Sequence, residues 1–283
     1  MKDLREKTSA PMMDCKNALT EAQGDMAAAE VILRKRGIAT AQKKAGRTAQ
    51  EGLVAAVVRP DASLAAMLEI NCESDFVART DAFLGLLNNL TEQVATQDPA
   101  SLEALLDSPY GASGHSVKEA VGEAVGKLGE NIVVRRFVRY ARSGDGWMGS
   151  YVHHGKIGVL VEASSDKPAT EALKEALKDV AMHVAASDPR FIHRDHVDPA
   201  LLATEKDIQA ARARTEGKPE KILEKIVEGR LAKFYEEICL LEQPFIRETN
   251  MSVTQWLASR HADIGKVTIT RFARFKVGEG VAV

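Results

Sequence analysis

An internal duplication limits the possible folds of this chain more than any other feature. Four apolar residues spaced four, three and four positions apart, as on one face of a helix, recur after 90 positions. The two sets are Phe83, Leu87, Leu90 and Val94, and Leu173, Leu177, Val180 and Val184. Each set ends at an Asp-Pro pair and follows an apolar run, typical of a buried strand, that ends in Glu69 or Glu162. The pattern predicts two homologous units with the same strand and helix framework.

A second repeat relates residues 136–140 to residues 271–275 at an offset of 135. Because this offset exceeds the first by 45 residues, the second unit is expected to contain an insertion of about that length. Residues 195–240 are the candidate, since two amphipathic helical stripes there flank the turn signal Gly217-Lys218-Pro219. The insertion is predicted to be an antiparallel hairpin of coiled-coil type.

The remaining segments complete the predicted organisation. Residues 1–37 predict a module of three short helices, the last ending at Gly37, and residues 38–51 predict a basic linker. One of Met12 and Met13 packs inside this module, or both meet a partner. Core module one covers residues 52–146, and core module two combines 147–194 with 241–283 around the hairpin at 195–240. The expected class is α+β, with antiparallel sheets in both modules.

Composition excludes several classes of protein. The 283 residues are 45% hydrophobic and 28% charged, which is typical of globular proteins, and the net charge of −2 provides no bulk attraction to nucleic acids or anionic membranes. No apolar run approaches the roughly 18 residues of a membrane span, and the charged N-terminus lacks the apolar region of a signal peptide. Three widely spaced cysteines fit free thiols in a reducing cytoplasm. We expect a cytoplasmic protein with no membrane or nucleic-acid partner.

No pattern of catalytic or metal-binding residues is recognisable. His193 and His196 lack a third ligand, and the cysteines and histidines do not have zinc-site spacing. Neither a Gly-x-Ser-x-Gly elbow nor a phosphate-binding glycine-rich loop is present. We therefore expect no covalent catalysis, no metal, no cofactor and no direct nucleotide binding.

The best candidate site is the corner where the first predicted strand meets its helix. In one interpretation Ser74 or Asp75 caps the helix and Phe76 folds back into the core. In the other, Phe76 is exposed for a partner protein, whose burial of one Phe side chain is worth about 1.5–3 kcal/mol. The equivalent corner of the second unit, Ser164–Asp166, lacks an aromatic residue. Phe76 is therefore easier to assign to function than to folding.

The stretch from Glu69 to Arg79 closely resembles the signature of the translation elongation factor Ts family, the guanine-nucleotide exchange factors of elongation factor Tu. Ser74 stands where the family usually has threonine, which keeps the hydroxyl group. A second stretch, which runs from Leu4 through Met12 to Leu19, is similar to the other signature of the family. Two independent motifs in the right order make the resemblance specific, and it extends over nearly the whole chain.

The resemblance implies a function, a UBA-like N-terminal module and a set of contacts. The chain would bind elongation factor Tu with GDP bound and promote GDP release by inserting Asp75 and Phe76 near the Mg²⁺ and phosphate site. The implied contact residues are Ser74, Asp75, Phe76 and Val77; Arg5, Met12 and Met13; Leu128, Gly129 and Glu130; and His153.

Without the resemblance, other interpretations stay open. Leu128–Glu130 is then an ordinary helix C-cap, and His153 is an exposed hairpin turn. The alternative function is an assembly protein that oligomerises through the duplicated sheets and the helical hairpin. An RNA-binding module is a weaker alternative, because no aromatic residues alternate with the charges of the basic linker.

Overall fold

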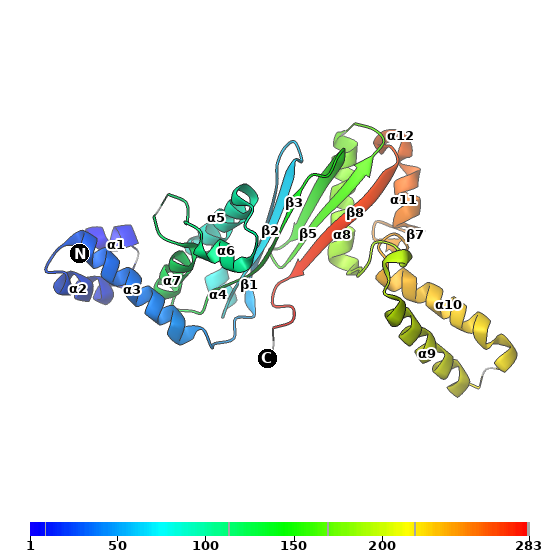
Figure 1. Ribbon diagram of the computed structural model, residues 1–283, viewed down its shortest axis with the longest axis horizontal. Helices are drawn as coiled ribbons and strands as arrows, with labels where there is room; N and C mark the ends of the chain where they lie inside the picture. Colours follow the sequence, from blue (N-terminus) through cyan, green and yellow to red (C-terminus); the bar gives the residue numbers. More distant parts are fainter. Residues whose placement is uncertain (9, 113, 169, 218, 282–283) are drawn as a thin grey trace.

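The computed structural model describes residues 1–8, 10–112, 114–168, 170–217 and 219–281. Figure 1 shows an elongated molecule, with three N-terminal helices at one end, two sheets with their helices in the middle and a pair of helices at the other end. Two three-stranded antiparallel sheets and a short two-stranded ribbon confirm the predicted α+β class. Among the described residues, no helix is both long enough and apolar enough to span a bilayer.

The first sheet has the strand order β1-β2-β3, formed by β1 (Glu51–Val58), β2 (Leu64–Cys72) and β3 (Val133–Ala141). Between β2 and β3 the chain forms α4 (Asp75–Ala78), α5 (Asp81–Gln97), α6 (Leu102–Asp107) and α7 (Val117–Leu128). The apolar stripe of α5 is buried with β2, since Phe83 and Leu90 belong to the same core as Leu68 and Ile70. Burial of this stripe is the main reason why the helix packs on the sheet.

The second sheet repeats this construction with the order β4-β5-β8, formed by β4 (Gly146–His153), β5 (Ile157–Ser165) and β8 (Val267–Lys276). Helix α8 (Glu171–Ser187) takes the place of α5, and its predicted apolar stripe is buried. Both helices end at an aspartate in the left-handed region, Asp98 with φ 51° and Asp188 with φ 48°. Between α8 and β8, apart from the two long helices described below, the chain forms η1 (Arg194–His196), β6 (Pro244–Phe245), β7 (Glu248–Ser252), α11 (Val253–Ser259) and α12 (His261–Ile264).

The two sheets meet through a reciprocal contact that the repeat at residues 136–140 and 271–275 creates. The guanidinium of Arg136 lies 4.3 Å from the ring centroid of Phe275, and that of Arg271 lies 4.0 Å from the ring centroid of Tyr140. Each arginine also pairs with a buried glutamate of its own sheet, Arg136 with Glu69 and Arg271 with Glu162. Each unit therefore supplies the arginine for one contact and the aromatic ring for the other.

Two antiparallel helices, α9 (Pro199–Thr215) and α10 (Glu220–Ile238), project from module two (Figure 1). Both lie within the predicted insertion, and an ion pair between Arg230 and Glu216 joins them. Gly217, with φ +72°, begins the turn, while Lys218 of the predicted turn lies outside the described residues. The coiled-coil character of this hairpin stays a prediction.

The N-terminal module contains α1 (Lys2–Thr8), α2 (Met12–Glu21) and α3 (Met26–Lys44). The predicted helix end at Gly37 is wrong, because α3 continues to Lys44 and includes the first half of the predicted linker. Gly37 is buried where α3 packs on α7, and a Cβ atom there would lie 3.0 Å from the carbonyl oxygen of Gly122. This glycine permits close helix packing and does not end the helix.

Candidate protein-interaction site

The corner between β2 and α5 presents Phe76 to solvent. Ser74 caps the separate short helix α4, since its hydroxyl accepts a hydrogen bond from the Val77 backbone N–H at 3.4 Å. The prediction that Ser74 or Asp75 caps the helix with the apolar stripe is wrong, because Thr80 caps α5. Phe76 does not fold back into the core, because 81% of its surface is exposed, more than for any other large hydrophobic residue described. Phe83, which is fully buried, supplies the aromatic ring of the core instead.

The residues around Phe76 hold the corner to the body of the module. Val77 packs against the hydrophobic core and Ala78 is buried within it. On the outer side, Asp75 and Arg79 form an ion pair of 2.7 Å across one helical turn. The backbone is thus held on both sides of Phe76, whose side chain lies outside the hydrophobic core.

Cys72 supports the same corner from inside. Its thiol donates a hydrogen bond to the carbonyl oxygen of Ser74 at 3.1 Å. Burial raises the pKa of the Cys72 thiol to about 12, so the group is a neutral donor at physiological pH and not a reactive thiolate.

The structure brings the predicted residues Leu128, Gly129 and Glu130 next to Ser74. Helix α7 ends at Gly129, which has φ 77° and donates its N–H to the Val125 carbonyl, so the predicted C-cap is correct. The carboxylate of Glu130 accepts hydrogen bonds from the hydroxyl and the backbone N–H of Ser74, at 2.5 and 2.9 Å. Leu128 is half-buried and packs against the core, whereas Gly129 is exposed.

Two other residues at these corners were not predicted. Glu73 accepts a hydrogen bond from the Asn131 backbone N–H at 2.6 Å, and the Asn131 side chain is buried. No local pattern could indicate this contact, because the two corners lie more than 50 positions apart in the sequence and meet only through the fold.

The other predicted contact residues lie elsewhere in the molecule. Arg5, Met12 and Met13 are on the N-terminal helices, and all three are exposed, Met12 by 52% and Met13 by 61%. Packing of either methionine inside the module is therefore wrong. The small core there is built from Leu4, Cys15, Ala18 and Ala29.

His153 is the last residue of β4 and is exposed at the turn before β5. Its Nδ1 lies 2.9 Å from the Tyr151 hydroxyl, and its ring contacts His154 edge-on. The turn contacts module one, because the Gly155 carbonyl accepts a hydrogen bond from the Val54 N–H of β1 at 2.7 Å.

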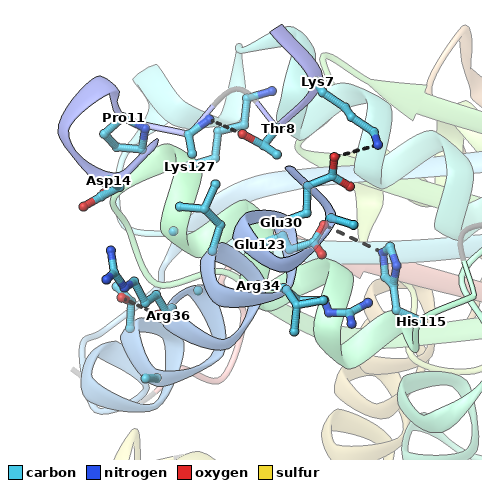
Figure 2. Close-up of a pocket in the computed structure, with 18 of the residues that line it drawn as sticks. Lys7, Thr8, Pro11, Asp14, Glu30, Arg34, Arg36, His115, Glu123 and Lys127 are labelled. Carbon is cyan, nitrogen blue, oxygen red and sulfur yellow. Dashed lines mark hydrogen bonds and ion pairs between the residues drawn. The ribbon is translucent and has the colours of Figure 1, made fainter. Parts of the chain in front are cut away.

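A groove of about 740 Å³ lies between the α1–α2 loop, α3 and α7 (Figure 2). Its walls carry charges of both signs, with an ion pair of 2.6 Å between Lys7 and Glu30, and the His115 ring lies 3.7 Å from the Glu123 carboxylate. Within the described ranges, no group of three or more His, Cys, Asp or Glu residues is arranged to hold a metal ion. The residues that line this groove do not include the predicted contact residues, so the exposed corner is the better candidate site.

Comparison with known proteins shows which family the chain resembles. A protein-family model described as "Elongation factor TS" matches residues 73–279. The protein named Elongation factor Ts of Thiobacillus denitrificans is 49% identical over 281 residues, which cover 99% of this chain and 91% of the relative. Those of Trichlorobacter lovleyi and Clostridium kluyveri are each 45% identical, over 99% of this chain and 91% and 92% of the relatives.

Proposed function

This chain belongs to the elongation factor Ts family of translation factors, and from that premise we propose that it is a guanine-nucleotide exchange factor for elongation factor Tu. The observation that carries the proposal is the exposure of Phe76 on an anchored corner. A large apolar side chain held in water by a well-packed backbone is typical of a residue that a partner buries.

The proposed activity is a coupling between two binding equilibria and involves no covalent chemistry. The factor forms a complex in which elongation factor Tu binds GDP more weakly, and GDP therefore weakens binding of the factor by the same ratio. Asp75 and Phe76 enter the partner near its Mg²⁺ and phosphate site and disturb the metal. Because the metal charge stabilises the phosphates, its displacement weakens nucleotide binding. GTP then binds and releases the factor.

The size of the Phe76 contribution follows from its exposure. Burying one Phe side chain is worth about 1.5–3 kcal/mol, which corresponds to roughly 10- to 100-fold in a rate or equilibrium constant. The side chain is 81% exposed before binding, so nearly all of this free energy is available for the complex.

Further contacts support the same complex in our proposal. Arg5, Met12 and Met13 bind the partner from the N-terminal module, where the two thioether side chains adapt to its surface. Leu128, Gly129 and Glu130, with Ser74 and Val77, border the Phe76 corner, and His153 adds a contact from module two.

We also propose that the protein acts in the cytoplasm and binds no nucleotide itself. The domain division predicted above stays our proposal, with residues 38–44 now assigned to helix α3. The N-terminal module is proposed to be UBA-like, and the hairpin is proposed to be a coiled coil.

The test is the release of fluorescent GDP from purified elongation factor Tu by catalytic amounts of the chain. The wild type is expected to accelerate release, and Phe76→Ala is expected to be roughly 10- to 100-fold less effective. Ile208→Ala, on the 52% exposed residue of α9, controls for loss of exposed apolar surface elsewhere. A wild type without effect rejects the exchange function. An undiminished Phe76→Ala variant rejects only the insertion of Phe76.

A further inference from the structure

In module one, two corners each hydrogen-bond to a carboxylate of the other. Glu130, in the corner after α7, accepts hydrogen bonds from the backbone N–H groups of Glu73 and Ser74, at 3.1 and 2.9 Å, and from the Ser74 hydroxyl at 2.5 Å. In return, Glu73 accepts a hydrogen bond from the Asn131 N–H at 2.6 Å. We call Glu73 and Glu130 the carboxylate clamp. Each carboxylate fixes the backbone of the corner from which the other one comes.

The clamp fixes α4, a helix too short to be stable by itself. Helix α4 has only four residues, and isolated helices of that length are unstable because nucleation is unfavourable. The hydroxyl of Ser74 connects the clamp with α4, since it donates to Glu130 and accepts from the Val77 N–H inside α4. The direction in which Phe76 points therefore depends on a carboxylate from another part of the chain. Hydrogen bonds to an ionised acceptor are about twice as strong as neutral ones, which suits this task.

The end of α3 is attached to the same two corners. The Lys44 ammonium donates to the carbonyl oxygen of Gly129, and Arg47 lies 3.5 Å from the Glu73 carboxylate. The Asn131 side chain donates to the Arg47 carbonyl at 2.8 Å. The clamp thus connects the Phe76 corner with the segment that carries the N-terminal module.

We propose that Glu130 and Glu73 are positioning residues for nucleotide exchange, which hold Phe76 in the direction needed for insertion before the partner arrives. The inference rests on the proposed function and adds to it a positioning role, which the proposed partner contacts do not include. The carboxylate of Glu130 accepts its hydrogen bonds from Glu73 and Ser74 of the same chain, so in addition to the partner contact proposed above it acts on Phe76 through Ser74. Preorganisation of this kind lowers the cost of reaching the productive complex.

The expected consequence is a change in rate within the complex. The N-terminal module still binds the partner when the clamp is broken, so the concentration of factor that gives half of the maximal rate changes little. Phe76 then samples several directions, and the maximal rate of GDP release falls. Glu130→Gln replaces the oxygen that accepts from the Ser74 hydroxyl by an NH2 group and removes the charge from the hydrogen bonds that remain. We therefore expect a decrease of roughly tenfold.

The experiment compares the wild type with Glu130→Gln, Phe76→Ala and the double variant over a range of factor concentrations. If Glu130 acts through Phe76, the double variant releases GDP no more slowly than Phe76→Ala alone, because the effects of coupled residues do not add. Ser74→Ala, which keeps both carboxylates but removes the hydroxyl that links Glu130 to α4, is expected to give a decrease similar to that of Glu130→Gln. Glu123→Gln, on the exposed face of α7, is the matched carboxylate control and is expected to match the wild type.

Hydrogen exchange of the Glu73 and Ser74 amides, which both donate to Glu130, provides a readout that does not involve the partner. Both amides are expected to exchange faster in Glu130→Gln while the β2 amides keep their protection, which also shows that the variant is folded. Multiplicative losses in the double variant, or unchanged exchange at Ser74, would overturn the positioning role while leaving the exchange function intact. A wild type that does not accelerate GDP release refutes the proposed function, and the positioning role with it.

Discussion

Replacement of Gly37 by leucine tests whether close packing between α3 and α7 positions the N-terminal module. A Cβ atom on Gly37 would lie 3.0 Å from the Gly122 carbonyl oxygen and 3.4 Å from Glu123 Cα. The contact is reciprocal, since a Cβ on Gly126 would lie 3.2 Å from Gly37 Cα. Backbone atoms therefore form both sides of this crossing, and no flexible side chain can move aside.

Two effects of opposite sign decide the result. Leucine favours a helix over glycine by about 0.8 kcal/mol, which by itself would stabilise α3. Overpacking by added methylene groups costs about 1–3 kcal/mol in ordinary cores, and here the first added carbon already meets backbone. We therefore expect Gly37→Leu to weaken the docking of α3 on α7 by about 1–2 kcal/mol. The same substitution at Gly85, which is exposed on α5 with nothing within 4 Å of its Cβ position, is expected to stabilise by about 0.8 kcal/mol.

Native-state hydrogen exchange is the suitable assay, because undocking of one module is a local opening. In Gly37→Leu the amides of α3 and α7 should lose protection, while those of the β4-β5-β8 sheet keep theirs. If Gly37→Leu is as protected as the wild type, or gains the same stability as Gly85→Leu, then the glycine contact does not hold the module in place and the reasoning is refuted.

Two further predictions concern the stability of module two. His183 is buried and accepts a hydrogen bond from the Ile246 N–H at Nδ1, so its Nε2 carries the hydrogen and donates to Gln243. Burial lowers the pKa of His183 from its usual 6.5, and the unfolded chain therefore binds a proton that the folded chain resists. The stability that neutral His183 contributes is complete above pH 6.5 and is lost as the pH falls through the lower pKa of the folded state. Urea denaturation at pH 5 should therefore show a lower free energy of unfolding than at pH 7. The difference between the two pH values should be smaller in His183→Gln. Arg271→Ala leaves the buried Glu162 without its cation and is expected to destabilise by about 3 kcal/mol in the same assay. Arg142→Ala, on an exposed arginine whose side chain donates to the Asp61 carbonyl, should change stability by less than about 0.5 kcal/mol. Equal effects of the two changes would contradict the proposed importance of the pair between Arg271 and Glu162.

Patterns that lie within one element could be predicted from the sequence. The apolar stripes of α5 and α8 repeat at helical spacing, and their burial follows directly from that spacing. The C-cap at Gly129 is also local, since it needs only a few neighbouring residues, whereas the break between α4 and α5, which gives Ser74 and Thr80 a helix each to cap, was not predicted. The exposure of Phe76 was one of two open interpretations, because a cap fixes the backbone but does not decide where the next side chain points.

Features that depend on two distant segments could not be predicted. The repeated arginine and aromatic residues were visible at positions 136–140 and 271–275, but the sequence does not indicate that each arginine stacks on the ring of the other repeat. Gly37 has the local appearance of a helix end, and only the fold shows that it lies within a continuous helix, at a close approach to Gly122 of α7. Glu73 and Glu130 are ordinary polar loop residues until the fold brings their corners together.

Comparison of the two duplicated corners shows that they are held by different partners. In module two the chain around α12 holds the corner, because the Ser165 hydroxyl donates to the Ile264 carbonyl at 2.7 Å and the Asp166 carboxylate accepts from the Lys266 N–H at 2.7 Å. The tip of that corner is nevertheless exposed, since Asp166 and Lys167 lie at the surface. In module one Ser74 bonds to Glu130 and Phe76 is open to solvent. Both corners are therefore anchored and exposed at the tip, and the aromatic residue of the first copy is a difference in sequence that the shared framework does not require.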